Sequence, residues 1–312
     1  MKVLIAGGTG FIGTYLCREL SERGHDVTAM SRSPGGADLP DGVETLAGDV
    51  SDADSIDGAA DGMDAVVNLV SLSPLFRPAG GNEMHDRVHR RGTENLLGEA
   101  EGADVDCFLQ MSGLGADSGG STDFLRAKGR AEEAVRDGDV PHVIFRPSVV
   151  FGDGGEFVSF TKEMKRLFAP ALPVYPLPGG GRTPFQPIWV GDLVPILADA
   201  LEEERHLGEL YHVGGPDVLT LREIADMVYE SEGKSVRVVG LPMGLARVGL
   251  TVLGTLGFKL GPDQYRSLRM NHTTPDNDLD AFGRTEADLT TFADYLGLSG
   301  RRDATSPAGT PA

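Results

Sequence analysis

The stretch VLIAGGTGFIG, residues 3–13, decides the fold of this chain. Val3–Ala6 is an apolar run without alternation, which is typical of a strand buried on both faces of a parallel sheet. The glycines that follow have the spacing G-x-G-x-x-G at positions 8, 10 and 13, and G-x-x-G-x-x-G at positions 7, 10 and 13. Glycine permits the tight turn out of the strand and lets a ligand approach the backbone. A helical pattern then runs from Phe11 to Arg23, with Gly24 at its end.

A second strand is predicted at Asp26–Met30, so the first thirty residues form one βαβ unit. This is the context in which the glycine motif binds the pyrophosphate of a dinucleotide, because the helix start offers free N–H groups and the positive end of its dipole. We therefore expect a dinucleotide-binding loop. The residues expected around the phosphates are Gly7, Thr9, Gly10, Phe11, Ile12 and Gly13.

The alternation of strand and helix patterns continues along the chain. Further strands are predicted at Val43–Leu46, Ala65–Leu69, Cys107–Met111 and His142–Phe145. Helices are predicted at Asp52–Ala60, Asn82–Glu101 and Thr122–Asp137. This order indicates an α/β protein with a doubly wound Rossmann parallel sheet, whose ligands bind at the carboxyl ends of the strands.

Glycine and proline become frequent after Gly152, which marks a change of organisation. We predict a Rossmann domain over residues 1–152 and a smaller C-terminal, substrate-side lobe over 153–299, with segments that return to the main sheet. Residues 300–312 are small and polar and are predicted to be a disordered tail. In the lobe, the patterns predict helices at Phe157–Phe168, Trp189–Glu204 and Thr220–Glu232, and a strand at Leu210–Val213.

The charge balance restricts the partners and the setting of the chain. Its net charge is −19, so it repels nucleic acid and anionic lipid. Lysine is scarce and Asp abundant, which suggests a high-salt cytoplasm in which the repulsion is screened. Two cysteines, Cys17 and Cys107, lie in apolar contexts and are interpreted as reduced core residues of a cytoplasmic protein.

No signal peptide and no transmembrane segment are predicted from the sequence. The longest apolar stretch, Leu241–Leu260, is interrupted by Arg247, Lys259 and glycines. We interpret it as a helix packed on the fold, with a peripheral contact to the inner face of a membrane as the open alternative.

The end of the second strand discriminates between the two nicotinamide dinucleotides. An acid there accepts from the 2′-hydroxyl of NAD, whereas a cation there suits the 2′-phosphate of NADP. The chain has Ser31, Arg32 and Ser33 at this point. Because the arginine fork and two hydroxyls can donate to a phosphate, we expect NADP(H) to be favoured over NAD(H).

These residues, together with segments further along, resemble the extended and atypical short-chain dehydrogenase/reductase superfamily. Within it, the chain is most similar to the branch of the 39 kDa accessory subunit of respiratory complex I; sugar epimerases and dehydratases are more distant. The segments that carry the resemblance are 7–13 (GGTGFIG), 48–50 (GDV), 88–95 (VHRRGTEN), 146–152 (RPSVVFG) and 185–192 (FQPIWVGD).

The resemblance implies roles for particular positions. Asp49 and Val50 would contact the adenine, and Asn68, Leu69 and Val70 would border the nicotinamide ribose. Arg146, Pro147 and Val149 would line the nicotinamide side. Lys128 matches the lysine of the Tyr-x-x-x-Lys motif, which anchors the ribose hydroxyls.

One departure from the family pattern changes the expected chemistry. The segment reads Phe124-Leu125-Arg126-Ala127-Lys128, so phenylalanine stands in the position of the tyrosine that transfers a proton. Phenylalanine has no such proton, and general acid–base catalysis contributes about 10² to 10⁴ in rate. The remaining catalytic candidates are Lys128 and Ser112, the latter as the match to the helper serine of the family.

Three functional hypotheses follow. The first is an NADP(H)-binding protein with a degenerate dehydrogenase site, whose cofactor is structural or regulatory. By resemblance alone, it would associate with a membrane respiratory or quinone system. The second is an active NADPH-dependent reductase or sugar-nucleotide epimerase or dehydratase with another proton donor. The third is a scaffold without cofactor. His85 and His89 are spaced like metal ligands, but they lack a clear third ligand, so no metal site is predicted.

Overall fold

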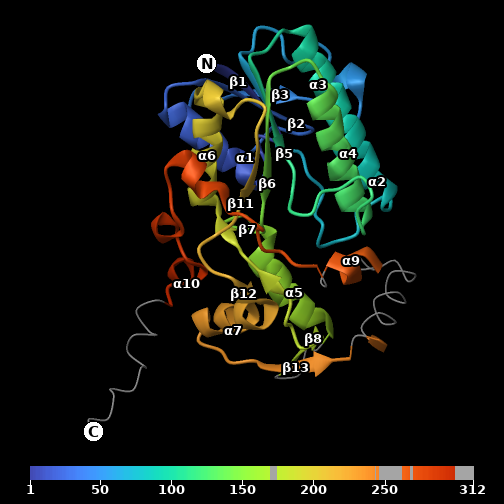
Figure 1. Cartoon of the computed structure of the whole chain (residues 1–312), viewed down its shortest axis with the longest axis vertical. Helices are drawn as coiled ribbons and strands as arrows, with labels where there is room; N and C mark the ends of the chain where they lie inside the picture. The colour runs from blue at the N-terminus through green and yellow to red at the C-terminus, as the bar shows by residue number, and fades with distance from the viewer. Residues whose placement is uncertain (169–173, 243, 246–261, 268–269, 299–312) are drawn as a thin grey trace.

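Seven strands form one sheet at the centre of the computed structural model (Figure 1). Each neighbouring pair in this sheet is parallel. The structure describes residues 1–168, 174–242, 244–245, 262–267 and 270–298. In spatial order the strands are β11 (Leu210–Val213), β6 (His142–Pro147), β5 (Cys107–Met111), β4 (Ala65–Asn68), β1 (Lys2–Ala6), β2 (Asp26–Ser31) and β3 (Glu44–Ala47). The predicted α/β Rossmann fold is confirmed.

Helices cover both faces of the sheet (Figure 1). In β1, Val3 and Ile5 pack in one apolar cluster with helices α1 and α6, whereas Leu4 and Ala6 belong to a second cluster with α3 and α4. Successive side chains of a strand point to opposite faces, so a strand between two helix layers is apolar throughout. These helices are α1 (Phe11–Glu22), α6 (Val190–Glu202), α3 (Gly92–Gly102) and α4 (Asp123–Asp137). Both cysteines are buried in the first cluster and unpaired.

Two predicted helices differ from the structure. The prediction of a helix at Asp52–Ala60 is wrong, because the only helical residues there are those of η1 (Ala53–Ser55), a single 3₁₀ turn. Gly58 has a φ of 71°, which ends any right-handed helix. Asn82–Glu101 is not a single α-helix: it consists of α2 (Glu83–His85), the π-helical segment η2 (Asp86–Arg91) and α3.

Residues after Gly152 form a smaller layer below the sheet in Figure 1, with an apolar core of its own. Two segments after Gly152 belong to the main sheet and its helices: α6 packs beside α1, and β11 pairs with β6 at the sheet edge. A capping box formed by Thr220 and Glu223 starts α7 at the beginning of the predicted helix Thr220–Glu232. The remaining strands are β7 (Val150–Phe151), β8 (Val174–Pro178), β9 (Pro184–Phe185), β10 (Ile188–Trp189), β12 (Leu219–Thr220) and β13 (Arg237–Leu241). The remaining helices are α5 (Glu156–Phe168), η3 (Glu204–His206), α7 (Leu221–Ser231), α9 (Pro262–Ser267), η4 (Asp278–Phe282), η5 (Glu286–Asp288) and α10 (Phe292–Tyr295).

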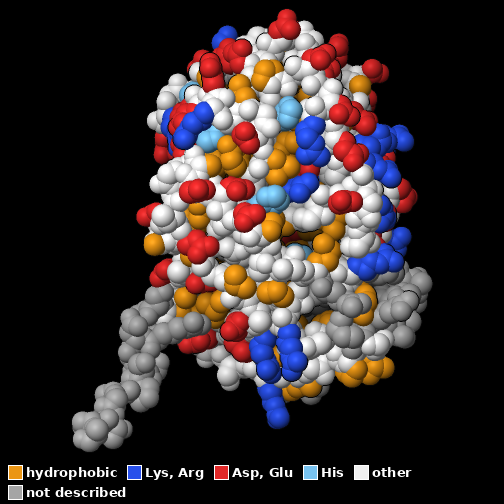
Figure 2. Space-filling view, viewed as in Figure 1, with side chains coloured by type: hydrophobic (Ala, Val, Ile, Leu, Met, Phe, Trp, Pro, Cys, Tyr) orange, Lys and Arg blue, Asp and Glu red, His pale blue; other side chains and the backbone are white. Residues whose placement is uncertain are grey.

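The surface is strongly acidic, as the composition requires. Asp and Glu side chains are spread over the sheet half of the face shown in Figure 2, with smaller groups of Lys and Arg among them. In the part of the chain that the structure describes, no helix is both long and apolar enough to cross a bilayer. The predicted tail, 300–312, and most of the apolar stretch Leu241–Leu260 lie outside the described residues.

Candidate dinucleotide-binding site

A cavity of about 840 Å³ opens at the carboxyl ends of the parallel strands. It lies where the chain order of the sheet reverses, between β1 and β4, which is the position at which open α/β sheets bind ligands. The predicted residues that line it are Gly7, Thr9, Gly10, Phe11, Ile12, Gly13, Ser31, Arg32, Asp49, Val50, Leu69, Val70, Ser112, Lys128, Pro147 and Val149. Three predicted residues, Ser33, Asn68 and Arg146, are not part of its wall.

The glycine loop leaves space for a ligand that side chains would fill. Gly7 has a φ of 84°, and its N–H donates to the carbonyl of Met30 at 2.8 Å. A Cβ at Gly13 would stand 2.2 Å from the oxygen of Gly7, so helix α1 can pack this close only with glycine there. Gly10 caps α1 without any side-chain hydrogen bond, which leaves the first amides of the helix for an anion. The loop therefore fits a diphosphate.

The end of β2 offers donors to a second phosphate. Ser31 lines the cavity, and its Oγ is buried with no hydrogen-bond partner in the described part of the chain. Arg32 also lines the cavity, is exposed, and forms no ion pair with any described carboxylate. Ser33 is exposed and lies outside the wall. An orphaned hydroxyl beside an unpaired guanidinium is a suitable pair of donors for a bound anion.

Asn68 acts through the backbone rather than on a ligand. It is 3% exposed, and its Nδ2 donates to Thr93 Oγ1 and to Gln110 Oε1, both at 3.0 Å. Its Oδ1 accepts from the N–H of Val70 at 3.2 Å. Asn68 therefore fixes the turn after β4 that brings Leu69 and Val70 to the cavity. Burial and three hydrogen bonds hold the Asn68 amide away from the cavity, so a contact between its side chain and the ribose stays a prediction.

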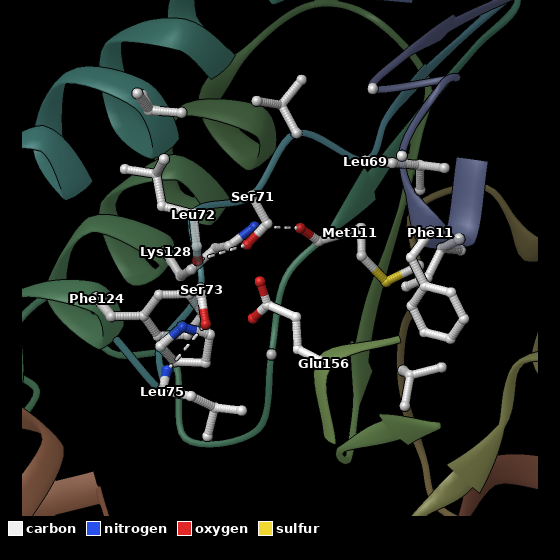
Figure 3. Close-up of a pocket in the computed structure, with 18 of the residues that line it drawn as sticks. Phe11, Leu69, Ser71, Leu72, Ser73, Leu75, Met111, Phe124, Lys128 and Glu156 are labelled. Carbon is white, nitrogen blue, oxygen red and sulfur yellow. Dashed lines mark hydrogen bonds between the residues drawn. The ribbon is translucent and has the colours of Figure 1, made fainter. Parts of the chain in front are cut away.

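Lys128 and Phe124 stand side by side on the α4 wall of the cavity, as the four-residue spacing on a helix requires (Figure 3). Lys128 is 1% exposed, and its Nζ donates to the carbonyl of Met111 at 2.8 Å. Burial lowers the pKa of Lys128 to about 8. The ammonium has three N–H donors and spends one on Met111, so two remain for ribose hydroxyls.

Ser112 is a poor proton donor for a ligand, because its own proton is engaged. Its Oγ lies 2.5 Å from the Oε1 of Glu132, a carboxylate that is fully buried. Arg146 holds the same carboxylate with Nε at 2.8 Å and Nη2 at 2.6 Å. The buried charge of Glu132 needs a partner, and Arg146 turns toward it instead of lining the cavity. Its place on the nicotinamide side stays a prediction.

Two histidines pack against Phe124, at ring-centroid distances of 5.7 Å for His85 and 5.1 Å for His89. The N–H of Leu72 donates to His89 Nε2 at 2.9 Å, which places the proton of neutral His89 on Nδ1. Burial lowers the pKa of both histidines. No third His, Cys, Asp or Glu joins them to form a metal site among the described residues.

The wall opposite the glycine loop was not predicted and is mostly apolar. Figure 3 shows the carboxylate of Glu156, from the first turn of α5, pointing into the space between Phe11 and Lys128. The sequence signal for Glu156 is weak, since it is only the first acid after a glycine-rich turn. The apolar side chains of this wall are Leu72, Leu75, Met84, Val88, Leu114, Leu125, Phe157, Phe160, Phe185, Leu221 and Met270.

The sheet order, the uncapped helix start and the cavity at the strand ends define a Rossmann dinucleotide-binding protein. Residues 7–166 match the family model described as NAD(P)H-binding. The chain belongs to this NAD(P)H-binding family. The resemblance to the complex I subunit branch, predicted from the sequence, agrees with the relatives described next.

Curated relatives agree with this assignment. The mitochondrial NADH dehydrogenase [ubiquinone] 1 alpha subcomplex subunit 9 of Arabidopsis thaliana is 30% identical over 254 residues, covering 78% of this chain and 61% of that protein. The chloroplastic divinyl chlorophyllide a 8-vinyl-reductase of Oryza sativa subsp. indica is 29% identical, covering 81% of this chain and 64% of the relative. The chain thus spans less than two thirds of the length of these relatives.

A solved structure shows the same fold. The UDP-glucose 4-epimerase of Thermus thermophilus, in complex with NAD, superimposes with a TM-score of 0.73, 20% identity and coverage of 98% of this chain and 100% of the epimerase. A dTDP-glucose 4,6-dehydratase from Streptomyces venezuelae also gives 0.73, at 21% identity, with 96% of both chains covered. At these identities the likeness concerns the fold alone.

The low pKa of Lys128 leads to a pH prediction. Its folded-state pKa of about 8 lies below the ordinary value of 10.5, so the ammonium is present below pH 8 and lost above it. We expect the affinity for a dinucleotide to be constant below pH 7 and to fall about tenfold as the pH passes through this range, because a charged donor is lost. Calorimetric titrations across pH will measure this fall.

Two variants separate Lys128 from other ionisable groups. The curve of Lys128→Met should be flat at the lower affinity, whereas Lys234→Met, which removes an exposed lysine, should keep the wild-type curve. A Lys128→Met variant with the full pH dependence would assign the transition to another group.

Proposed function

We propose that this protein binds NADP(H) in the strand-end cavity and uses it mainly as a structural or regulatory ligand. The observation that carries the proposal is the uncapped, glycine-lined start of α1, which faces the same cavity as Phe124. When bound, the nicotinamide supplies a hydride donor or acceptor. The glycine loop would hold the diphosphate, Ser31 and Arg32 the 2′-phosphate, and Lys128 the ribose.

Three side chains are the reason for proposing that the dehydrogenase site is degenerate. Phe124 cannot transfer a proton, and Ser112 donates its proton to Glu132. Lys128 already donates to Met111 and is suited to anchoring a ribose. With these groups, the usual transfer between tyrosine and a carbonyl oxygen has no donor. A ligand at a hundred times its dissociation constant still adds about 2.7 kcal/mol to the free energy of unfolding.

The test is to identify the dinucleotide that copurifies with the protein in high salt, and then to measure NADPH oxidation. Tight NADPH binding without turnover of quinones, sugar nucleotides or small carbonyls supports the proposal. Turnover that disappears in Lys128→Ala supports an enzyme instead. If no dinucleotide copurifies and NADPH does not bind, the protein is a scaffold without cofactor.

The preference for NADP(H) has its own test at Arg32. We expect Arg32→Ala to weaken NADPH binding about tenfold, because a charge-assisted hydrogen bond to the 2′-phosphate is lost. NADH binding should be unchanged, since NADH lacks that phosphate. Arg18→Ala removes another exposed arginine, on α1, and should leave both affinities unchanged. Equal losses of NADPH and NADH binding in Arg32→Ala would contradict the preference.

A second candidate function is an active NADPH-dependent reductase. The observation in its favour is the large apolar wall beyond the glycine loop, which a purely structural cofactor does not require. Two relatives are named as reductases: the rice vinyl-reductase and an NAD(P)H azoreductase from Xenophilus azovorans, 25% identical over 81% of each chain. Such an enzyme would need a proton donor other than Phe124. An epimerase or dehydratase, the alternative suggested by the relatives with the same fold, would also need a proton donor other than Phe124.

The proposed setting is a high-salt cytoplasm, beside a membrane respiratory or quinone system by analogy with the Arabidopsis relative. At a net charge of −19, self-repulsion destabilises the compact state at low ionic strength. The melting temperature should therefore rise between about 0.1 M and about 1 M KCl, as the Debye length shortens from ~10 Å to ~3 Å. A melting temperature that is independent of KCl would contradict a high-salt adaptation.

A further inference from the structure

His85 is a cavity residue whose polarity the proposed function does not use. It lines the cavity beside Phe124 and is 2% exposed. Its Nδ1 is sealed without a hydrogen-bond partner, and neither ring nitrogen bonds any residue that the structure describes. Buried polar atoms are nearly always paired, so an imidazole at a cavity wall without any partner among the described residues is unusual. Since Nδ1 is sealed, Nε2 is the nitrogen that can meet a ligand.

The neighbouring His89 also has a buried Nδ1 without a hydrogen-bond partner, but it differs from His85 at Nε2. His89 is fixed by the N–H of Leu72, so its Nε2 is already used. The segment η2, which begins directly after His85, is π-helical over six residues, and such segments occur frequently at functional sites. His85 therefore differs from His89 in having an unused nitrogen at Nε2, although both pack on the same phenylalanine ring.

The charges around His85 favour a neutral ring. Asp123 and Asp263 raise its pKa and Lys128 lowers it, but burial outweighs them and lowers the pKa overall. Both carboxylates are already engaged: Asp123 with Arg126, and Asp263 with Asn82 and Arg266. A neutral imidazole carries one N–H and one lone pair, so it can donate to a carbonyl oxygen without bringing a charge into an apolar wall.

The surroundings of His85 indicate the class of ligand. The wall beyond the glycine loop is built from apolar side chains such as Leu72, Leu75, Phe157, Phe160 and Phe185. Among the described residues that line this half, the arginine is Arg87 and the carboxylates are Glu156 and Asp263. A second diphosphate, as in a sugar nucleotide, would face one guanidinium against two carboxylates. A flat, uncharged ring compound avoids this repulsion and buries apolar surface.

We propose that the cavity binds, beside the dinucleotide, an apolar ring compound that bears a carbonyl oxygen, and that His85 Nε2 donates a hydrogen bond to this oxygen next to the ring of Phe124. The inference rests on the proposed function, because the dinucleotide fills the opposite half of the cavity. It assigns His85 a binding role that neither Phe124 nor Ser112 can fulfil.

The experiment compares three probes on the full chain saturated with NADP⁺, so that no hydride is available. The probes are 2-methyl-1,4-naphthoquinone, 2-methylnaphthalene, which has the same rings without carbonyl groups, and UDP-glucose. We expect the quinone to bind about tenfold more tightly than the hydrocarbon, as one buried hydrogen bond allows, and UDP-glucose to bind more weakly than the quinone. The same titrations without NADP⁺, and of NADP⁺ itself, test dinucleotide binding separately.

Variants of His85 identify the donor. His85→Phe should bind the quinone as weakly as the hydrocarbon, with NADP⁺ affinity unchanged, whereas His85→Gln keeps an N–H and should retain part of the preference. His142→Phe, at the amino end of β6 and away from the cavity, should behave as the wild type. If His85→Phe does not fold, a shift of the His85 Nε2 nitrogen resonance on quinone binding to the wild type decides the question.

Three results would overturn the inference: a quinone preference that persists in His85→Phe, equal binding of the two ring probes to the wild type, or tighter binding of UDP-glucose. A protein that binds NADP⁺ but shows no quinone preference refutes only the role of His85. A protein that does not bind NADP⁺ refutes the proposed function.

Discussion

Gly13→Ala is expected to lower dinucleotide affinity about 100-fold and the free energy of unfolding by about 3 kcal/mol. A Cβ at this position would stand 2.2 Å from the oxygen of Gly7 and 2.7 Å from the Cα of Gly8. Both neighbours are backbone atoms of the phosphate-binding loop, so no side chain can move aside. The helix must shift away from the sheet, and its first amides then leave the diphosphate. Calorimetric titration with NADPH and urea unfolding will measure the two effects.

Gly98→Ala is the matched control. Gly98 lies on the exposed side of α3, and a Cβ there meets no atom within 4 Å. Alanine is favoured over glycine in helices by about 1 kcal/mol, so this variant should be slightly more stable and bind NADPH normally. Wild-type affinity in Gly13→Ala would show that the loop does not hold the diphosphate.

Glu132→Gln is expected to destabilise the fold by about 3 kcal/mol, the second large effect. The fully buried carboxylate holds Arg146 through two hydrogen bonds and accepts the proton of Ser112. Glutamine has the same shape but offers one acceptor oxygen and no charge, so the guanidinium of Arg146 loses its counterion. Urea unfolding measures the lost free energy of unfolding, as a lower midpoint concentration of urea with an unchanged dependence of that free energy on urea concentration.

The adjacent Glu133→Gln controls for the change in net charge. Glu133 is exposed on the same helix, and removing its charge should alter stability by less than about 0.5 kcal/mol. Because the surface is acidic, a general charge effect would stabilise both variants alike. Equal stability of Glu132→Gln and Glu133→Gln would therefore show that the buried network contributes nothing to the fold.

The architecture could be predicted because it depends on local patterns. Val3–Ala6 and Cys107–Met111 are apolar with little alternation, as a strand covered on both faces requires. The glycine spacing identified the phosphate loop, since the turn, the close approach and the helix start are all contained in seven consecutive residues. The helix predicted at Asp52–Ala60 is wrong because its apolar residues are buried without a helix, and the φ of Gly58 is not visible in a hydrophobic pattern.

By itself, the sequence determined the sheet, the glycine loop, the phenylalanine at position 124 and the cation after β2. Tertiary structure alone decided how the polar side chains are used. Asn68 and Arg146 were predicted from the resemblance to contact the cofactor, yet hydrogen bonds hold Asn68 away from the cavity wall and Arg146 pairs with Glu132. The proton of Ser112 is also donated to Glu132, twenty residues further along the chain. His85 and Glu156 come to the cavity from separate elements. The physical reason is that a backbone motif is local, whereas a hydrogen-bond partner or an apolar wall depends on residues that only folding brings together.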